Sequence, residues 1–173
     1  MIRVVLTGSE STGKSTLAAR LAEHYHASFV PEFVRDFAAR KGSAVAFDDH
    51  GPIARGQMGL EDAATTVGHD LIIQDTDLLS TAIYSAHYFG KAPPWIVKTA
   101  RERRPDLYLL LEIDVPWVAD PVRDRGHMRE EMQQLFRDAV RDSGAPFEII
   151  RGNWDERFAA AVRAIDAIRP VTP

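Results

Sequence analysis

A glycine-rich segment near the start of the chain, Gly8–Thr16, has the spacing of a phosphate-binding loop. It reads Gly-Ser-Glu-Ser-Thr-Gly-Lys-Ser-Thr and matches the Walker A pattern in full. The glycines let such a loop wrap so that backbone N–H groups point at phosphate oxygens, and the following helix adds the positive end of its dipole. We therefore expect ATP to bind here. The predicted contacts are Gly8, Ser11, Thr12, Gly13, Lys14, Ser15 and Thr16.

Two side chains of this loop, and one carboxylate further along the chain, have specific chemistry in phosphoryl transfer. The Lys14 ammonium should reach the β- and γ-phosphates, and the Ser15 hydroxyl should bind Mg²⁺. Asp75 ends an apolar run, the place of a Walker B carboxylate, and is the second expected Mg²⁺ ligand. The alternative is that Asp75, Thr76 or Asp77 only caps the helix that follows. The expected cofactors are ATP and Mg²⁺.

An acidic segment after the second apolar run offers a general base. Glu32 should face the phosphate loop across the cleft and take the proton of an acceptor hydroxyl, although Asp75 is a second candidate for that role. Arg35 could steady phosphate or substrate. The alternative is a helix N-terminus with favourable acidic residues. The predicted acceptor contacts are Glu32, Arg35, Asp36, Gln57, Asp77 and Asp120.

The irregular segment 114–126 is a candidate lid. It is broken by Pro116 and Pro121 and carries Arg123 and Arg125. Arginines in a closing lid can neutralise charge on the transferred phosphoryl group. A solvated basic loop is the alternative. The predicted catalytic set is Lys14, Glu32, Asp75, Arg123 and Arg125.

Apolar runs alternate with helical stripes along the chain, and this order predicts the fold class. The expected strands are Ile2–Leu6, Ser28–Val30, Leu71–Ile73, Leu107–Ile113 and Phe147–Ile150. Helical patterns fill the intervals, including Glu32–Arg40, Gly51–Gly68, Thr76–Tyr88 and a last helix with a capping box at Asn153 and Glu156. We expect an α/β P-loop NTPase three-layer sandwich, with a five-stranded parallel sheet and helices on both faces. Ligands should bind at the carboxyl ends of the strands.

Length and composition exclude several classes. The 173 residues fit a single domain, residues 1–173. The formal net charge of −4 argues against binding to nucleic acid, and the absence of cysteine excludes disulfides and thiolate sites. No apolar window approaches the roughly 18 residues of a membrane span, and no secretory segment is evident, so a cytoplasmic protein with a small-molecule substrate is expected. The oligomeric state stays open.

Other P-loop classes fit the sequence less well. GTPases carry an Asn-Lys-x-Asp motif for base specificity, and this chain has none. AAA and helicase cores need more residues, a sensor arginine and a Walker B run of acids. The candidate base, acceptor pocket and lid favour a small-molecule kinase. A nucleotide-regulated ATP-binding protein with little turnover is the alternative.

The chain resembles a known family, the ribosylnicotinamide kinase domain of NadR-type proteins. The matching segments are Gly8–Leu17, Pro31–Phe37, Ile53–Gln57, Gln74–Leu78, Val115–Gly126 and Ile150–Arg157. The most distinctive is Pro-Trp-Val-Ala-Asp at 116–120, followed by Arg123. The resemblance implies an ATP-dependent kinase that phosphorylates the 5′-hydroxyl of nicotinamide riboside and gives nicotinamide mononucleotide for NAD synthesis. Glu32 also resembles the catalytic Glu of deoxynucleoside kinases.

The chain departs from the long members of this family in two respects. They carry a helix-turn-helix and an adenylyltransferase domain ahead of the kinase, whereas Walker A starts here at residue 8. They are also expected to have aromatic residues where this chain has Pro31 and Leu60. Tyr84 or Trp117 would then supply an aromatic face for the pyridine ring. A P-loop kinase for another nucleoside or vitamin is the alternative.

Overall fold

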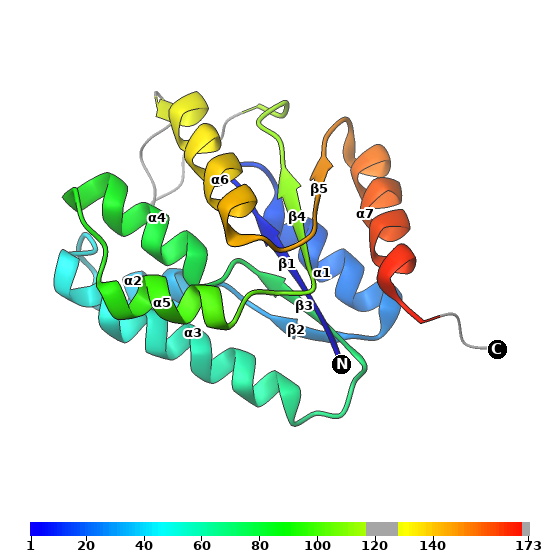
Figure 1. Ribbon diagram of the computed structural model, residues 1–173, viewed down its shortest axis with the longest axis horizontal. Coiled ribbons are helices and arrows are strands. Elements are labelled where there is room, and N and C mark those ends of the chain that lie inside the picture. The colour runs from blue at the N-terminus through cyan, green and yellow to red at the C-terminus, as the bar shows by residue number, and fades with distance from the viewer. Residues whose placement is uncertain (117–127, 171–173) are drawn as a thin grey trace.

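The predicted apolar runs form one parallel sheet. The computed structural model describes residues 1–116 and 128–170. Its strands run in the order β2-β3-β1-β4-β5, and all neighbours are parallel (Figure 1). The prediction of an α/β P-loop NTPase fold with a five-stranded parallel sheet is therefore confirmed. The strand bounds are β1 (Ile2–Thr7), β2 (Ser28–Val30), β3 (Leu71–Asp75), β4 (Leu107–Leu111) and β5 (Phe147–Ile150).

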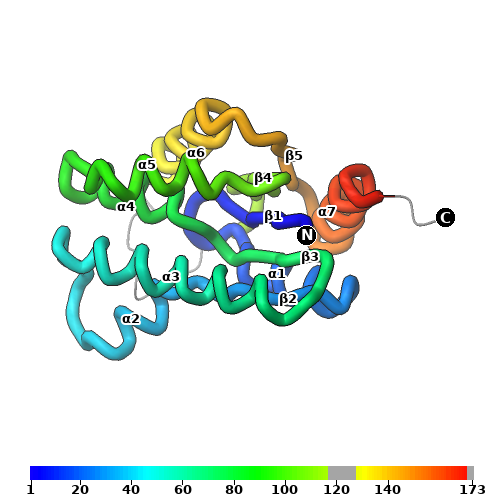
Figure 2. Tube along the Cα trace, turned by 60° about the horizontal axis from the view of Figure 1, so that its bottom comes forward, coloured from blue at the N-terminus to red at the C-terminus, as the bar shows by residue number. Residues whose placement is uncertain are grey.

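Helices cover both faces of the sheet because side chains alternate along each strand. Val4 and Leu6 of β1 pack in one core with α1 and α7, whereas Val5 lies in a cluster with residues of α6 and β4. In both ribbon views α7 lies beside β5 at one end of the molecule, and α2 to α5 gather at the other (Figures 1 and 2). The helix bounds are α1 (Lys14–Tyr25), α2 (Phe33–Lys41), the 3₁₀ helix η1 (Phe47–Asp49), α3 (His50–Thr65), α4 (Leu78–Phe89), α5 (Pro94–Glu102), α6 (Arg129–Ser143) and α7 (Trp154–Ile168).

The sequence did not predict α5. Its first residue is Pro94, and proline is a residue that often ends a helix. Proline suits that position because its missing N–H has no partner there anyway and its fixed φ is helical. The new helix packs on α4 through Ile96 and Ala100. By contrast, the capping box of Asn153 and Glu156 at the start of α7 is confirmed.

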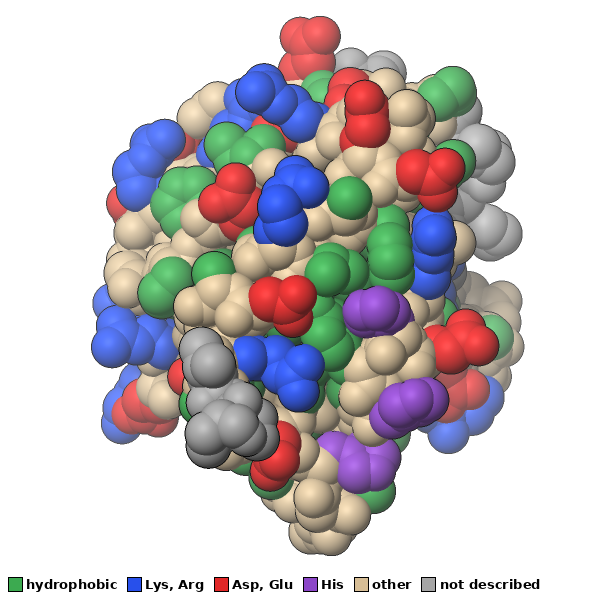
Figure 3. Space-filling view, turned by 90° about the vertical axis from the view of Figure 1, so that its right-hand side faces the viewer, with side chains coloured by type: hydrophobic (Ala, Val, Ile, Leu, Met, Phe, Trp, Pro, Cys, Tyr) green, Lys and Arg blue, Asp and Glu red, His purple; other side chains and the backbone are tan. Residues whose placement is uncertain are grey.

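The surface beside α7 mixes both signs of charge. Lys and Arg side chains are interspersed there with Asp and Glu, and hydrophobic side chains lie between them (Figure 3). In the part of the chain that the structure describes, no helix combines the length and the apolar character needed to cross a membrane.

Candidate active site

The Walker A segment forms a tight loop between β1 and α1. Gly8, Ser11 and Gly13 all have positive φ, at 129°, 54° and 82°, so the chain turns back on itself. The Lys14 side chain is buried along this loop, and its Nζ donates to the carbonyl oxygens of Gly8 (3.0 Å) and Ser9 (2.7 Å). An ammonium group held at this place suits the β- and γ-phosphates of a nucleotide, as expected for Lys14.

Both loop glycines are needed for close packing as well as for their backbone angles. A Cβ on Gly8 would lie 2.7 Å from the carbonyl oxygen of Leu111, and one on Gly13 would lie 2.4 Å from the indole ring of Trp154. The loop is thus pressed between the end of β4 and the start of α7. The Walker A glycines therefore fit both the phosphate and the surrounding fold.

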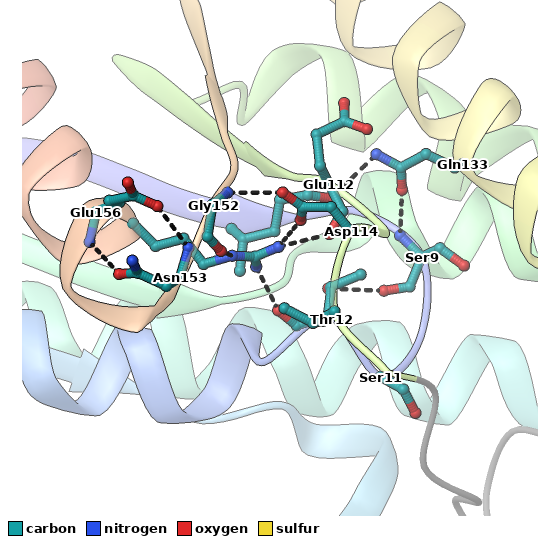
Figure 4. Close-up of polar contacts among 12 residues, drawn as sticks. Ser9, Ser11, Thr12, Glu112, Asp114, Gln133, Gly152, Asn153 and Glu156 are labelled. Carbon is teal, nitrogen blue, oxygen red and sulfur yellow. Dashed lines mark hydrogen bonds and ion pairs between the residues drawn. The ribbon is translucent and has the colours of Figure 1, made fainter.

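Two side chains of α6 hold the loop, and neither contact was predicted from the sequence. The Gln133 amide accepts from the Ser9 N–H (3.0 Å) and donates to the Leu111 carbonyl (3.0 Å), as Figure 4 shows. Arg129 donates to the Ser11 carbonyl (3.0 Å). Gln133 is buried beside Met132 and Phe136 of the same helix, but nothing in the sequence around it identifies its partner.

Asp75 ends β3, in register with Leu6 of β1 just before the loop. Its side chain is 2% exposed, and Oδ1 finds no hydrogen-bond partner among the described residues. A buried carboxylate oxygen usually has a partner, so Asp75 is suited to bind a cation or a water. Ser15 lies exposed in the first turn of α1 and offers the hydroxyl. Within the residues described, no three His, Cys, Asp or Glu side chains cluster in a way that could hold a metal ion.

Thr76 follows Asp75 and has an unusual backbone. Its φ is +72°, which is rare for a β-branched residue, and its buried hydroxyl has no partner in the described part of the chain. The Thr76 N–H donates to the Leu6 carbonyl (3.0 Å), so the turn is tied to β1. This turn carries the chain from the metal candidate Asp75 to the start of α4.

Both carboxylate oxygens of Asp77 accept hydrogen bonds within the protein. Its Oδ1 accepts from the N–H groups of Leu79 (3.1 Å) and Ser80 (3.4 Å), so it caps α4, and its Oδ2 accepts from the Tyr108 hydroxyl (2.6 Å). Burial raises the pKa of this carboxyl, although these hydrogen bonds oppose the effect. The capping alternative is therefore correct for Asp77, and the acceptor contact predicted for it stays a prediction.

Glu32 lies at the start of α2, directly after β2, and is 5% exposed. The Arg35 Nε donates to Glu32 Oε2 at 2.8 Å, so the carboxylate is held in a defined position. Since β3 separates β2 from β1 in the sheet, Glu32 and the phosphate loop lie at the same edge with Asp75 between them. This order fits a carboxylate that receives the proton of an acceptor bound over the end of β3.

Residues of α3 hold the start of α2, next to Glu32, in place. The Gln57 Oε1 accepts from the Phe33 N–H (2.9 Å), and the Phe33 ring packs against Gly56, where a Cβ would lie 2.2 Å from it. Gln57 is 2% exposed, and its Nε2 has no partner among the described residues. Gln57 therefore holds the backbone next to Glu32, and the acceptor contact predicted for it stays a prediction.

Asp36 lies on α2 with its side chain 66% exposed, and its Oδ2 pairs with Arg40 at 2.9 Å. The acceptor contact predicted for it stays a prediction. Pro31 and Leu60 both line a surface groove between β2 and α3. The Tyr84 ring packs inside the protein against Tyr88 and Phe136.

Several predicted residues lie outside the described part of the chain. They are Asp120, Arg123 and Arg125 of the lid and the aromatic candidate Trp117.

Curated proteins are similar to this chain in sequence. The NadR protein of Escherichia coli, called a trifunctional NAD biosynthesis/regulator protein, is 31% identical over 169 residues, and its Salmonella typhimurium counterpart is 30% identical. The alignment covers 94% of this chain but only 41% of the E. coli protein. The chain thus spans less than half the length of these relatives.

Solved structures show the same fold. A NadR protein in complex with NR superposes with a TM-score of 0.80 at 22% identity, over 99% of this chain and 52% of that one. A thymidylate kinase from Ehrlichia chaffeensis has a TM-score of 0.67 at 14% identity, over 97% of this chain and 98% of that one. The resemblance to NadR-type proteins is therefore confirmed.

A family model described as an AAA domain, AAA_28, matches residues 3–157. That range includes the phosphate loop, the Glu32 corner, Asp75 and the first turn of α7. The description names a class of domain and no reaction. The chain belongs to this AAA_28 family of P-loop domains.

Proposed function

We propose that this chain is an ATP-dependent kinase that phosphorylates the 5′-hydroxyl of nicotinamide riboside and produces nicotinamide mononucleotide for NAD synthesis. The observation that carries the proposal is the order of the sheet. Strands β2, β3 and β1 are neighbours, so they present Glu32, Asp75 and the phosphate loop side by side at one edge. A base, a metal ligand and a phosphate cradle in that order are the parts that phosphoryl transfer needs.

The phosphate loop and Lys14 bind the triphosphate. Backbone N–H groups of the loop donate to phosphate oxygens, and the Lys14 ammonium exchanges the Gly8 and Ser9 carbonyls for β- and γ-phosphate oxygens. Ser15 and Asp75 would hold Mg²⁺ together with the nucleotide. When bound, Mg²⁺ withdraws charge from the phosphoryl oxygens.

Glu32 serves as the general base. The 5′-oxygen attacks the γ-phosphorus, the bond from that phosphorus to the β–γ bridging oxygen breaks, and ADP leaves. The hydroxyl proton passes to the Glu32 carboxylate, which Arg35 holds in place. From the sequence, Arg123 and Arg125 are proposed to neutralise charge on the transferred group, and Asp120 to contact the acceptor.

The identity of the acceptor is supported by the relatives. The curated relatives of this chain are NAD biosynthesis proteins, and solved NadR proteins have been crystallised with NR and with NAD and AMP-PNP. Nicotinamide riboside carries a fixed positive charge on its pyridinium ring, which a site edged by Glu32 and Asp75 would favour over a neutral nucleoside. We therefore assign the acceptor as a cationic riboside.

Turnover with an identified product tests the proposal. The protein is incubated with ATP, Mg²⁺ and nicotinamide riboside, ADP release is followed, and the product is identified by ³¹P NMR and chromatography. We expect a 5′-monophosphate, with kcat lowered on the order of 10²–10⁴-fold by Glu32→Gln and ATP affinity unchanged. The assignment of the base is wrong if Asp75→Asn causes the larger loss while the Mg²⁺ dependence stays as in the wild type.

A further inference from the structure

Arg157 is the largest of the fully buried side chains in the described part of the chain. It lies in the first turns of α7, far in sequence from the phosphate loop, and its exposure is 0%. A buried guanidinium is costly unless its N–H groups are all directed at acceptors. The acceptors of its hydrogen bonds therefore show which parts of the structure Arg157 holds in place.

Its hydrogen-bond partners lie in three separate parts of the chain, one of which is the phosphate loop. Nη1 donates to the Thr12 carbonyl (2.8 Å), Nη2 to the Glu112 carbonyl (3.0 Å) and to the Asp114 carboxylate, and Nε to the Gly152 carbonyl (2.8 Å). Figure 4 labels the residues that supply these acceptors, Thr12, Glu112, Asp114 and Gly152, and they lie around one place. One side chain thus joins the phosphate loop, the end of β4 and the turn between β5 and α7.

Asp114 closes the same network. Its Oδ2 accepts from the Gly152 N–H (2.6 Å) while its Oδ1 binds Arg157. Burial by itself would raise the pKa of Asp114, but the Gly152 hydrogen bond and the Arg157 charge outweigh it and lower the pKa. Asp114 is consequently an ionised partner that fixes the arginine.

The contact with Thr12 bears directly on the phosphate site. In a trans peptide the C=O of one residue and the N–H of the next point in opposite directions. When Arg157 holds the Thr12 carbonyl outside the loop, the Gly13 N–H must point to the inside, where phosphate oxygens bind. Arg129 acts in the same way one residue earlier, because it holds the Ser11 carbonyl and so directs the Thr12 N–H.

The first turn of α7 supports this orientation from a second side. The indole of Trp154 covers Gly13 closely enough that a Cβ there would lie 2.4 Å from the ring. The guanidinium carbon of Arg157, Cζ, lies 5.7 Å from the centre of that ring. The Thr12–Gly13 peptide is therefore held by α7 through a hydrogen bond and a packing contact, and it has little freedom to turn over.

We propose that Arg157 is a positioning residue for the nucleotide: through Thr12 it aims loop N–H groups at the phosphates, with Asp114 fixing its own guanidinium. This inference rests on the proposed function, since it assigns the phosphate loop to ATP. It concerns nucleotide affinity and is independent of which acceptor the enzyme uses. No Walker A motif contains this residue, because it lies at the other end of the chain.

The test measures ATP affinity by titration calorimetry without acceptor, for the wild type, Arg157→Met and Arg157→Lys. We expect ATP Kd to rise roughly 10–100-fold in Arg157→Met, because the loop N–H groups would no longer point at the phosphate oxygens. Arg157→Lys should recover part of the loss, because an ammonium restores the charge but cannot reach all the partners at once. The KM of the acceptor should stay within about 2-fold, because its site lies on β2 and β3.

Ile165→Ala is the matched control. Ile165 is also fully buried on α7, but it lies two turns beyond Arg157 and packs in the core with residues of α1. This variant should lower Tm while ATP Kd stays within about 2-fold of the wild type. The proposal is overturned if the Arg157 variants bind ATP normally, or if Ile165→Ala weakens ATP equally at a similar Tm.

Asp114→Asn provides an independent variant if the Arg157 replacements do not fold. Its side chain is 40% exposed, so the substitution leaves the core intact. Loss of the anchoring charge should raise ATP Kd roughly 3–10-fold, and unchanged affinity would overturn the proposal. If the wild type itself fails to bind ATP, both this inference and the proposed function are wrong. Normal ATP binding without turnover on any riboside contradicts the proposed function alone.

Discussion

Replacing Gly56 by alanine should displace the proposed base, Glu32, and lower kcat, although Gly56 itself lies on α3. A Cβ at this position would lie 2.2 Å from the Phe33 ring, whereas carbon atoms in contact stay about 3.5–4.0 Å apart. The ring must therefore move by more than about 1 Å. Phe33 directly follows Glu32, and its N–H is bound by Gln57, so the movement is passed to the carboxylate.

The expected loss is roughly 10–100-fold in kcat, the usual result of misplacing a reacting group by about 1 Å. ATP Kd should stay within about 2-fold, because the phosphate loop is held by α6 and α7. The assay is steady-state turnover on nicotinamide riboside with calorimetric ATP binding on the same preparations.

Gly59→Ala is the control, since it is one turn further along the same helix and a Cβ there meets nothing within 4 Å. It should keep full kcat and raise Tm slightly, because alanine is the better helix former by about 1 kcal/mol. Phe33→Ala in the Gly56→Ala background should recover part of the activity by making room. The reasoning is refuted if Gly56→Ala turns over like Gly59→Ala.

Three further changes test other parts of the account. Lys14→Ala should lower turnover by orders of magnitude while circular dichroism shows an intact fold, and substantial turnover in the folded variant would remove Lys14 from the site. Asp75→Asn should raise the Mg²⁺ concentration needed for half-maximal rate, and an unchanged requirement would mean that Asp75 is no metal ligand. Burial, and then the nearby Asp77 carboxylate, raise the pKa of Glu61 from 4.5 to about 7 against the effect of Arg103, so the folded state favours its protonated form. That stability is complete below about pH 4.5 and lost as the pH rises through 7, so Tm should fall over this range. Glu61→Gln should flatten the fall, and a slope equal to that of the wild type would contradict the pKa shift.

Local patterns in the sequence were enough to predict the sheet and the phosphate loop. The strands are continuous apolar runs because a parallel sheet is buried on both faces, and the loop has a fixed spacing because backbone N–H groups must converge. The end of β3 was underestimated: it continues through Gln74 and Asp75 because they pair with β1 despite their polar side chains. Pro94 concealed α5, since proline both ends and begins helices.

The parts of the site that depend on long-range contacts were beyond sequence reasoning. Arg157 and Thr12 are separated by 145 residues, and Gln133 and Ser9 by 124. No periodicity or motif relates such positions. Asp77 illustrates the converse, because its place after a strand suggested a ligand contact, whereas the geometry of the turn directs its carboxylate to the helix N-terminus and Tyr108.

The most direct test of the central claim is a comparison of acceptors at equal concentration with ATP and Mg²⁺. The panel contains nicotinamide riboside, nicotinic acid riboside, the common nucleosides and, as a cationic decoy, thiamine. We predict the highest kcat/KM for nicotinamide riboside, with nicotinamide mononucleotide and ADP as the products. A common nucleoside with a higher kcat/KM would contradict the assigned acceptor, and the absence of turnover on every compound would contradict the kinase itself.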